Sequence, residues 1–322
     1  MTQTAHEPQP AVAAAGEHHL TPEQVRFFDD NGYLILRNRI PADVVQRLRD
    51  AADAWIGAAD GLPEDDPRLE DHRFANRPSG RVLFRVDYLH GKQQAASLEL
   101  LGCPEMLGIA ESLAGPNFVP TYESMVFKNT GDGAPIPWHQ DAVHPRNWRI
   151  FNVDVYLDPS LSGEGALWVL PRSHKAPYDL CRLEGHEWNV PESVEVEMGP
   201  GDVLLHDTMV VHGSPPVLGN RLRRTLYYEF RAAEQILAEG PWDRDWVDAR
   251  MRLVPLALAE AARSRPDVPG FEWRAEPWLR PESSGDTETE LRVVHTVHSP
   301  SAHCSAGSVV SRPDERPSTP AT

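Results

Sequence analysis

Short apolar stretches separated by glycines and prolines run through the middle of the chain. They predict β-strands over residues 82–88, 118–127, 151–157, 167–170, 194–197, 202–206 and 224–231. Strands of this length between Gly and Pro turns are typical of a sandwich or barrel rather than of a parallel sheet. The pattern therefore predicts a mainly β core.

Helical periodicity appears on both sides of this core. Thr21, followed by Pro22 and by Gln24 at the third helical position, predicts a capped helix that ends at Gly32. A short strand, 33–36, follows it. Apolar residues at helical spacing predict three further helices, over 41–58, 104–113 and 246–262. The charged, turn-rich residues 60–80 predict a loop.

The two ends of the chain lack such patterning. Residues 1–19 are rich in Ala, Gln, Pro and Thr, and residues 276–322 are rich in Ser, Thr, Pro and Glu. Segments of this composition cannot bury enough apolar surface to fold, so we expect a disordered N-terminal arm and a largely disordered tail. Residues 20–275 would then form one mainly β domain with flanking helices.

Charge narrows the range of partners. The 322 residues include 31 Lys and Arg against 48 Asp and Glu, which gives a net charge of −17. Nucleic acids and anionic membranes bind to basic surfaces, so both are excluded as partners. No segment approaches the roughly 18 apolar residues of a membrane helix. The remaining partner class is a small molecule, cationic or neutral, and the oligomeric state is left open.

Cysteine usage predicts the compartment. Cys103, Cys181 and Cys304 have no short spacing between them, which fits neither a disulfide framework nor a thiolate zinc site. The first twenty residues lack the basic start and apolar stretch of a secretory signal. We therefore expect reduced thiols and a cytoplasmic protein.

The candidate chemistry begins at His139 and Asp141. Side chains two apart in an extended segment project from the same face, so both can bind one metal ion. His212, at the end of a distant apolar strand, suits a third ligand. Two imidazoles and one carboxylate form the facial triad of non-haem ferrous oxygenases, which leaves three coordination positions open. His206 is a rival third ligand, but we favour a structural role for it near its strand end.

Arg223 lies eleven residues beyond His212, at the start of the next predicted strand. A guanidinium is a planar, two-pronged donor that matches a carboxylate and stays charged when buried. At the floor of a metal pocket, it would bind the distal carboxylate of a dicarboxylic acid cosubstrate. The alternative is a surface arginine within the group Arg221, Arg223 and Arg224.

Taken together, these motifs resemble the phytanoyl-CoA dioxygenase family of Fe(II)- and 2-oxoglutarate-dependent oxygenases. The resemblance covers about residues 20–232 and includes His212-Gly213-Ser214 and the segment from Gly165 to His174. It implies a double-stranded β-helix, the cupin-like jelly roll. The implied iron ligands are His139, Asp141 and His212, and the implied 2-oxoglutarate contacts are Arg223, Ser214 and Lys128. One departure is Arg172, because the family turn usually has Gly there.

The resemblance also implies a reaction. With Fe(II), 2-oxoglutarate and O2, the enzyme would hydroxylate an unactivated C–H bond of a small molecule of bacterial specialised metabolism, with succinate and CO2 as co-products. Related halogenases have Ala or Gly in place of Asp141, so halogenation is disfavoured. Desaturation and ring formation stay open. Candidate substrate contacts are Arg85, Tyr88, Glu123 and Trp168.

Two other function classes remain. A zinc hydrolase can use the same His, Asp and His ligands, but it needs a nearby general base and gives Arg223 no role. A non-catalytic jelly-roll binding module would usually have lost a ligand, whereas His139, Asp141, His212 and Arg223 are all present.

Overall fold

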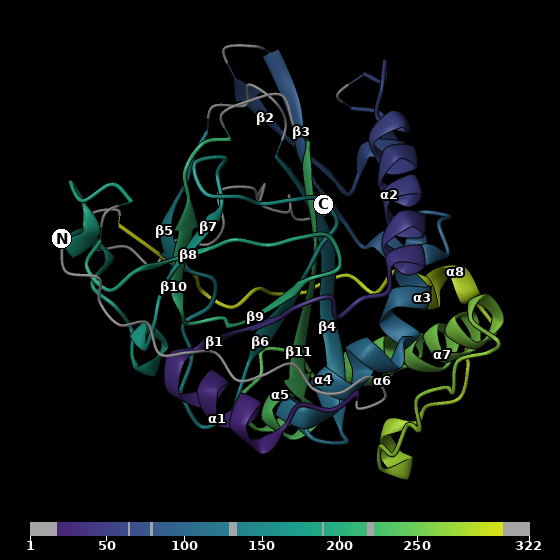
Figure 1. The fold of residues 1–322 in the computed structure, drawn as a ribbon. Helices are drawn as coiled ribbons and strands as arrows, with labels where there is room; N and C mark the ends of the chain where they lie inside the picture. The colour runs from purple at the N-terminus through teal and green to yellow at the C-terminus, as the bar shows by residue number, and fades with distance from the viewer. Residues whose placement is uncertain are drawn as a thin grey trace, which may run out of the picture.

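Two antiparallel sheets form the core of the computed structural model (Figure 1). The structure describes residues 18–304 except 64, 78–79, 129–133, 189 and 218–221. The seven-stranded sheet contains, in spatial order, β1 (Tyr33–Leu36), β9 (Val203–Asp207), β6 (Phe151–Tyr156), β11 (Arg223–Ala232), β4 (Phe118–Lys128), β3 (Gly80–Asp87) and β2 (His72–Arg77). The five-stranded sheet contains β12 (Ala302–His303), β5 (Ile136–Gln140), β10 (Val211–Ser214), β7 (Leu167–Leu170) and β8 (Val194–Val196). The predicted double-stranded β-helix is confirmed.

Helices cover the outer face of the larger sheet (Figure 1). The α-helices are α1 (Pro22–Asn31), α2 (Ala42–Gly57), α3 (Ala96–Gly102), α4 (Pro104–Ala114), α5 (Ala233–Glu239), α6 (Arg244–Met251), α7 (Leu253–Ser264) and α8 (Thr287–Leu291). Short 3-10 turns are η1 (Pro67–Leu69), η2 (Leu89–Gly91), η3 (Ser173–Lys175), η4 (Leu180–Leu183) and η5 (Pro277–Leu279). The helix predicted over 246–262 is two helices that meet at Arg252.

Local sequence explains the first helix and two turns. Thr21 and Gln24 form the expected capping box, and Gly32 ends α1 in the left-handed region at φ 80°. A Cβ on Gly32 would lie 2.4 Å from the His174 ring, so only glycine fits there. Arg172, where a glycine was expected, also has a left-handed φ of 69°, and its N–H donates to Asn31 O at 2.9 Å. The turn therefore keeps the conformation that glycine favours.

The larger sheet places apolar and polar residues on opposite faces. Along β11, Leu226, Tyr228 and Phe230 belong to the apolar core beneath the helices. Arg223 and Tyr227, at alternate positions, lie on the other face, since side chains along a strand alternate. Across the sheet, their register partners are Lys128 on β4 and Asp154 on β6, respectively. The inner face of this sheet is therefore lined with polar groups, which suits a binding site rather than a dry core.

Strand β2 lies within residues 60–80, which were expected to form a loop. Residues 72–77 instead pair antiparallel with β3 as the edge strand of the larger sheet. Their composition, His-Arg-Phe-Ala-Asn-Arg, lacks the apolar content that the prediction required. Edge strands are often polar because one side of the strand faces solvent, so the pattern misses them.

The region after residue 275 lies on the domain as far as residue 304. Leu291 and Val293, two of the few apolar residues of the expected tail, pack against the main core. Arg292 forms ion pairs with Asp71 at 2.9 Å and with Glu70 at 3.0 Å. The composition does not reveal these contacts, since they are polar and made with residues far away in the chain. The expected N-terminal arm is almost wholly outside the described residues.

A disulfide joins Cys181 in η4 to Cys304, with the two sulfurs 2.11 Å apart. This corrects the expectation of three reduced thiols. The two residues are 123 positions apart, so their spacing carried no signal of pairing. Cys103 is a buried free thiol.

Close packing of α3 on α7 gives a testable contrast between two glycines. A Cβ on Gly102 would lie 2.0 Å from Ala257 O, whereas Gly57 at the end of α2 has open space around it. We expect Gly102→Ala to lower the free energy of unfolding by about 1–3 kcal/mol through overpacking. The control, Gly57→Ala, should raise it by up to about 1 kcal/mol because alanine favours helix. Urea unfolding measures both, and equal effects would contradict the packing argument.

Candidate metal centre

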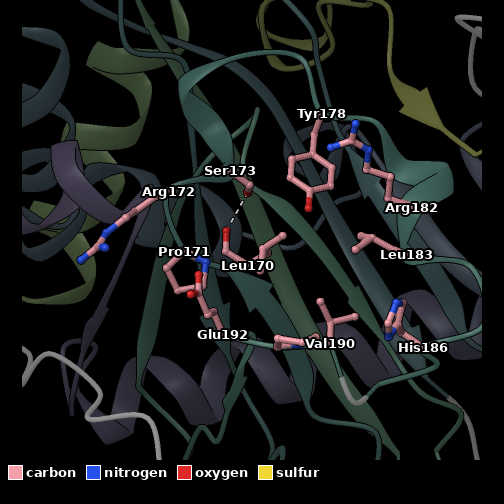
Figure 2. A pocket seen from close by; sticks show the side chains of 11 residues that line it. Leu170, Pro171, Arg172, Ser173, Tyr178, Arg182, Leu183, His186, Val190 and Glu192 are labelled. Carbon is pink, nitrogen blue, oxygen red and sulfur yellow. Dashed lines mark hydrogen bonds between the residues drawn. The ribbon is translucent and has the colours of Figure 1, made fainter.

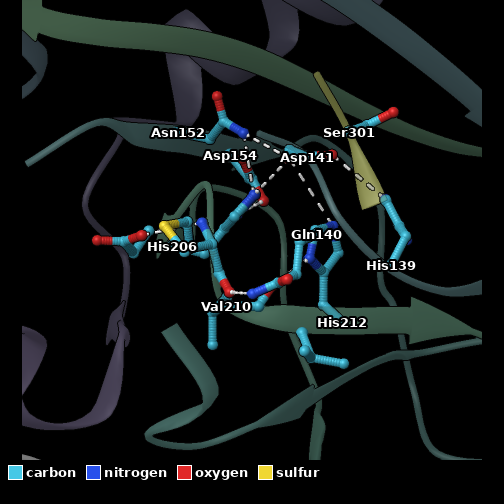
Figure 3. Close-up of polar contacts among 12 residues, drawn as sticks. His139, Gln140, Asp141, Asn152, Asp154, His206, Val210, His212 and Ser301 are labelled. Atoms are coloured by element: carbon cyan, nitrogen blue, oxygen red, sulfur yellow. Dashed lines mark hydrogen bonds and ion pairs between the residues drawn. The ribbon is translucent and has the colours of Figure 1, made fainter. Parts of the chain in front are cut away.

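Three side chains meet beside β5 and β10 of the smaller sheet (Figure 3). His139 on β5 and His212 on β10 are direct register partners, and Asp141 follows β5 by one residue. One ligand atom from each of the three lies within 4.8 Å of the others. The Nε2 atom of His139 is 3.3 Å from Oδ1 of Asp141, and the two imidazole centroids are 4.2 Å apart. The fold therefore brings together the three residues that the sequence selected.

Backbone carbonyls orient both imidazoles. Nδ1 of His139 lies 2.8 Å from Pro137 O, and Nδ1 of His212 lies 3.0 Å from Val210 O. A carbonyl only accepts, so Nδ1 of each ring carries the hydrogen and Nε2 keeps its lone pair. Both Nε2 lone pairs are thereby available to a shared cation. This orientation by the second ring nitrogen is typical of metal-binding histidines.

Electrostatics fits a divalent cation. Burial, together with neighbouring His139, lowers the pKa of His212 to about 3, so the imidazole is neutral. Burial by itself would raise the pKa of Asp141, but the surrounding imidazoles hold it well below its ordinary value. A carboxylate and two imidazoles within 4.8 Å form a donor set that suits Fe(II).

The rival residue, His206, supports Asp141. Its Nε2 is 3.2 Å from Asp141 Oδ2, and its Nδ1 is 2.9 Å from Asp154 Oδ2. Burial favours neutral His206, but Asp154 and Asp141 outweigh it and raise the pKa to about 10. Each ring nitrogen of His206 faces a carboxylate, and His206 is not part of the cluster that could hold the ion, so it links Asp141 to Asp154.

Two residues that help to hold Asp141 in place were not among those predicted from the sequence. Nδ2 of Asn152 donates to Asp141 Oδ2 at 2.8 Å, and Asp154 accepts from His206. Both lie on β6, where polar residues alternate with Phe151, Val153 and Val155. That alternation was visible within the strand predicted over 151–157, and it would have marked one face as polar.

Removing the Asn152 amide tests this support. We expect Asn152→Ala to weaken Fe(II) binding about tenfold, because Asp141 loses a donor that fixes its orientation. Anaerobic titration with Fe(II) measures the affinity. The matched control is Asn147→Ala, which removes an exposed amide bonded to Glu239 and should leave the affinity unchanged. An unchanged affinity in Asn152→Ala would show that Asp141 needs no such support.

A second cluster contains two buried cations, Arg223 and Lys128, which face each other across β11 and β4. Nη1 of Arg223 donates to Ser160 Oγ at 3.1 Å and to Gly165 O. Nζ of Lys128 donates to Pro215 O at 3.0 Å and to Ser214 Oγ. Arg223 is only 6% exposed and is not the surface arginine of the alternative. The three expected cosubstrate contacts therefore lie together.

The four candidate substrate contacts do not lie together. They are distributed over both faces of the larger sheet and the outer face of the smaller sheet. Arg85 is on the inner face, where its Nε lies 2.9 Å from Asp87 Oδ1, and the Tyr88 hydroxyl accepts from the His295 N–H at 3.0 Å. Glu123 is on the helix side, in a fully buried ion pair with Arg250. Trp168 packs against the apolar cluster outside the smaller sheet. Glu123 and Trp168 therefore lie on faces of the sheets other than the ones that carry the candidate ligands.

A cavity of about 20 Å³ next to Asp141 is lined by Tyr122, Glu229, Trp242 and His295, among others. A larger cavity of about 450 Å³ lies outside the smaller sheet, between Tyr178, Arg182 and Val190 (Figure 2). None of the candidate ligands lines this larger cavity.

No helix in the described part of the chain is long and apolar enough to cross a membrane.

Comparison with known proteins identifies a family for this chain. The family model for phytanoyl-CoA dioxygenase (PhyH) matches residues 28–225. A probable alpha-ketoglutarate-dependent hypophosphite dioxygenase of Stutzerimonas stutzeri is 29% identical over 231 residues, 66% of this chain and 79% of the relative. The ectoine dioxygenase of Nocardia farcinica is 26% identical, over 74% of this chain and 87% of the relative. The mouse peroxisomal phytanoyl-CoA dioxygenase is 27% identical, over 61% and 63%.

Solved structures share the architecture. AviO1 from Streptomyces viridochromogenes Tue57 superposes with a TM-score of 0.57 at 27% identity, covering 68% of this chain and 96% of AviO1. EctD from S. alaskensis, solved with 2-oxoglutarate and 5-hydroxyectoine, has the same fold, with a TM-score of 0.56 at 20% identity over 72% and 86%. The family model covers strands β1 to β10 and all three candidate ligands. The chain belongs to the phytanoyl-CoA dioxygenase family of non-haem iron dioxygenases, which use Fe(II) and 2-oxoglutarate.

Proposed function

We propose that this protein hydroxylates an unactivated C–H bond of a small molecule, with release of succinate and CO2. The observation that carries the proposal is the convergence of His139, Asp141 and His212 within 4.8 Å. The buried cations Arg223 and Lys128 supply the second requirement, a site for a dicarboxylate. A complete facial triad with its carboxylate supports hydroxylation over halogenation.

The chain's own residues would perform distinct tasks. Bound Fe(II) would supply the activation of O2. His139 and His212 would present neutral Nε2 atoms to it, and His206 and Asn152 would keep Asp141 ionised and oriented. Arg223 would hold the distal carboxylate of 2-oxoglutarate through a charge-assisted fork, with Lys128 and Ser214 beside it. The buried inner face would keep bulk water from the reacting C–H bond.

The substrate class follows from relatives and from charge. Hypophosphite dioxygenase, methylphosphonate hydroxylase and ectoine dioxygenase are bacterial relatives named for small polar substrates. We infer a small molecule of bacterial specialised metabolism for this chain. The net charge of −17 disfavours an acyl-CoA, whose phosphates would favour basic surroundings. Of the four substrate contacts expected from the sequence, we retain Arg85 and Tyr88, because they lie on the inner side of the larger sheet.

Localisation is part of the same proposal. We place the protein in the cytoplasm, although two of the three thiols on which that expectation rested are paired. Disulfides are rare in the reducing cytosol, and those found there are mostly catalytic or redox-sensing. A cytoplasmic location therefore requires a redox-active Cys181–Cys304 bond.

Anaerobic spectroscopy tests the function. We expect 2-oxoglutarate added to the ferrous protein to produce a weak visible charge-transfer band, and air to convert 2-oxoglutarate into succinate in the presence of a substrate from a broad panel. A zinc hydrolase would show neither result and would cleave esters or amides with Zn²⁺ bound. A non-catalytic module would show Fe(II) affinity no better than that of Asp141→Ala. Absence of both the band and the turnover would refute the proposal.

A further inference from the structure

The C-terminal segment crosses the opening of the metal site. In Figure 1, the yellow chain leaves α8 and runs across to the edge of the smaller sheet, where it ends as β12. There, His303 is the register partner of His139 and Ala302 that of Gln140. The His303 ring stacks on the His139 ring with centroids 5.5 Å apart and planes 6° apart. We name residues 294–304 the strap.

The strap also closes the space beside Asp141. His295, His298 and Ser299 line the cavity of about 20 Å³ there, which holds about one water molecule. No organic substrate fits in that volume. Figure 3 shows Ser301 and the strand of the strap next to His139. A substrate can therefore approach the metal ligands from this side only if the strap moves.

The strap is held by hydrogen bonds and by the His295 ring, which stacks on Trp242 with the centroids 4.9 Å apart. Trp246 Nε1 donates to Val294 O at 2.9 Å, Trp242 Nε1 to Val297 O at 3.1 Å, and the Val143 N–H to Pro300 O at 2.8 Å. The side chains of Val294 and Val297 are 40% and 47% exposed. Segments with few buried apolar contacts open locally at low free energy.

The disulfide holds the other end of the strap. Cys304 directly follows β12 and is bonded to Cys181 in η4, which packs beside β5. The cross-link therefore limits how far His303 can move from His139. Cys181 is exposed, so a thiol reagent can reach it. Exposed disulfides are the labile and regulatory ones more often than buried ones.

We propose that the Cys181–Cys304 disulfide latches the strap over the metal site and that its reduction opens the site to substrate. A dithiol reductant would attack one sulfur, form a mixed disulfide and release the other cysteine as a thiolate, which takes a proton. The second thiol of the reductant would then displace the remaining cysteine. Two electrons and two protons pass to the cysteines, and the reductant becomes a disulfide. Only the claim about substrate access rests on the proposed function.

Hydrogen exchange of the metal-free full chain tests the latch without using activity. In the oxidised protein, we expect slow exchange in peptides covering the strap and in the peptide that contains Val143. After treatment with dithiothreitol, exchange in both should become at least about tenfold faster. Cys304→Ser and Cys181→Ser should exchange at the fast rate with or without dithiothreitol. Cys103→Ser, which alters only the buried free thiol, should keep the full response.

Two further measurements make the proposal refutable. Thiol titration of the unfolded, air-purified chain should find one thiol before reduction and three after it. Removal of bound Fe(II) by a chelator should be about tenfold faster in Cys304→Ser than in the oxidised wild type. Three thiols before reduction, or equally slow strap exchange with and without the disulfide, would overturn the latch. A protein that binds no Fe(II) would refute the proposed function and leave the exchange result valid.

Discussion

An Asp141→Ala variant is expected to lose at least about a thousandfold in Fe(II) affinity and to show no 2-oxoglutarate turnover. The substitution removes the one anionic donor of the site and leaves two neutral imidazoles, whereas even changes to residues that support a ligand cost 10–100-fold. Anaerobic Fe(II) titration and the charge-transfer band with 2-oxoglutarate measure the two losses.

Folding should survive this substitution. His206 keeps its partner Asp154 at 2.9 Å, so the variant does not leave an unpaired buried charge there. Thermal unfolding without metal checks this, and a melting temperature near that of the wild type is expected. Asp245→Ala is the matched control, since Asp245 is an exposed carboxylate in the first turn of α6. Wild-type Fe(II) affinity in Asp141→Ala would exclude Asp141 as a ligand.

Replacing Arg223 with alanine is expected to raise the KM for 2-oxoglutarate about a hundredfold. A charge-assisted hydrogen-bonded pair contributes up to about 3 kcal/mol, and about 1.4 kcal/mol corresponds to a factor of ten in affinity. Arg223→Lys should recover part of the loss, because an ammonium keeps the charge but not the two-pronged geometry. Steady-state turnover at varied 2-oxoglutarate concentration gives the KM.

The neighbouring arginine provides an internal control. Arg224 faces the other side of the sheet, where it bonds to Asp158 at 2.8 Å and to Asp53 at 2.6 Å. Arg224→Ala should therefore lower stability while the KM for 2-oxoglutarate stays the same. Equal increases in KM for both variants would mean that Arg223 acts through the fold and not through the cosubstrate.

Much of the fold could be predicted because its signals are local. The capping box at Thr21 and Gln24 and the stop at Gly32 depend on residues within one turn of α1. The strand predictions succeeded where apolar residues faced the helices, as on β6 and β9. The edge strand β2 and the break between α6 and α7 lacked such patterns, so the prediction missed them.

Part of the site could be predicted for a similar reason. A metal requires particular donor atoms at particular spacings, and His139, Asp141 and His212 show both in the sequence. Contacts that depend on burial were not visible. Glu123 was selected as a substrate contact, but strand alternation turns it toward Arg250, where two opposite charges are buried together. The sequence did not show which face of β4 is the inner one.

The sequence by itself indicated the candidate donor set, the mainly β architecture and the arginine that we propose for 2-oxoglutarate, because residue type and spacing specify them. Only the tertiary structure decided that His206 supports Asp141, that Cys181 pairs with Cys304 and that the strap lines the cavity next to Asp141. The first two features join residues that are 65 and 123 positions apart, His206 with Asp141 and Cys181 with Cys304. Contacts at such separation depend on the packing of the two sheets, and no local pattern encodes them.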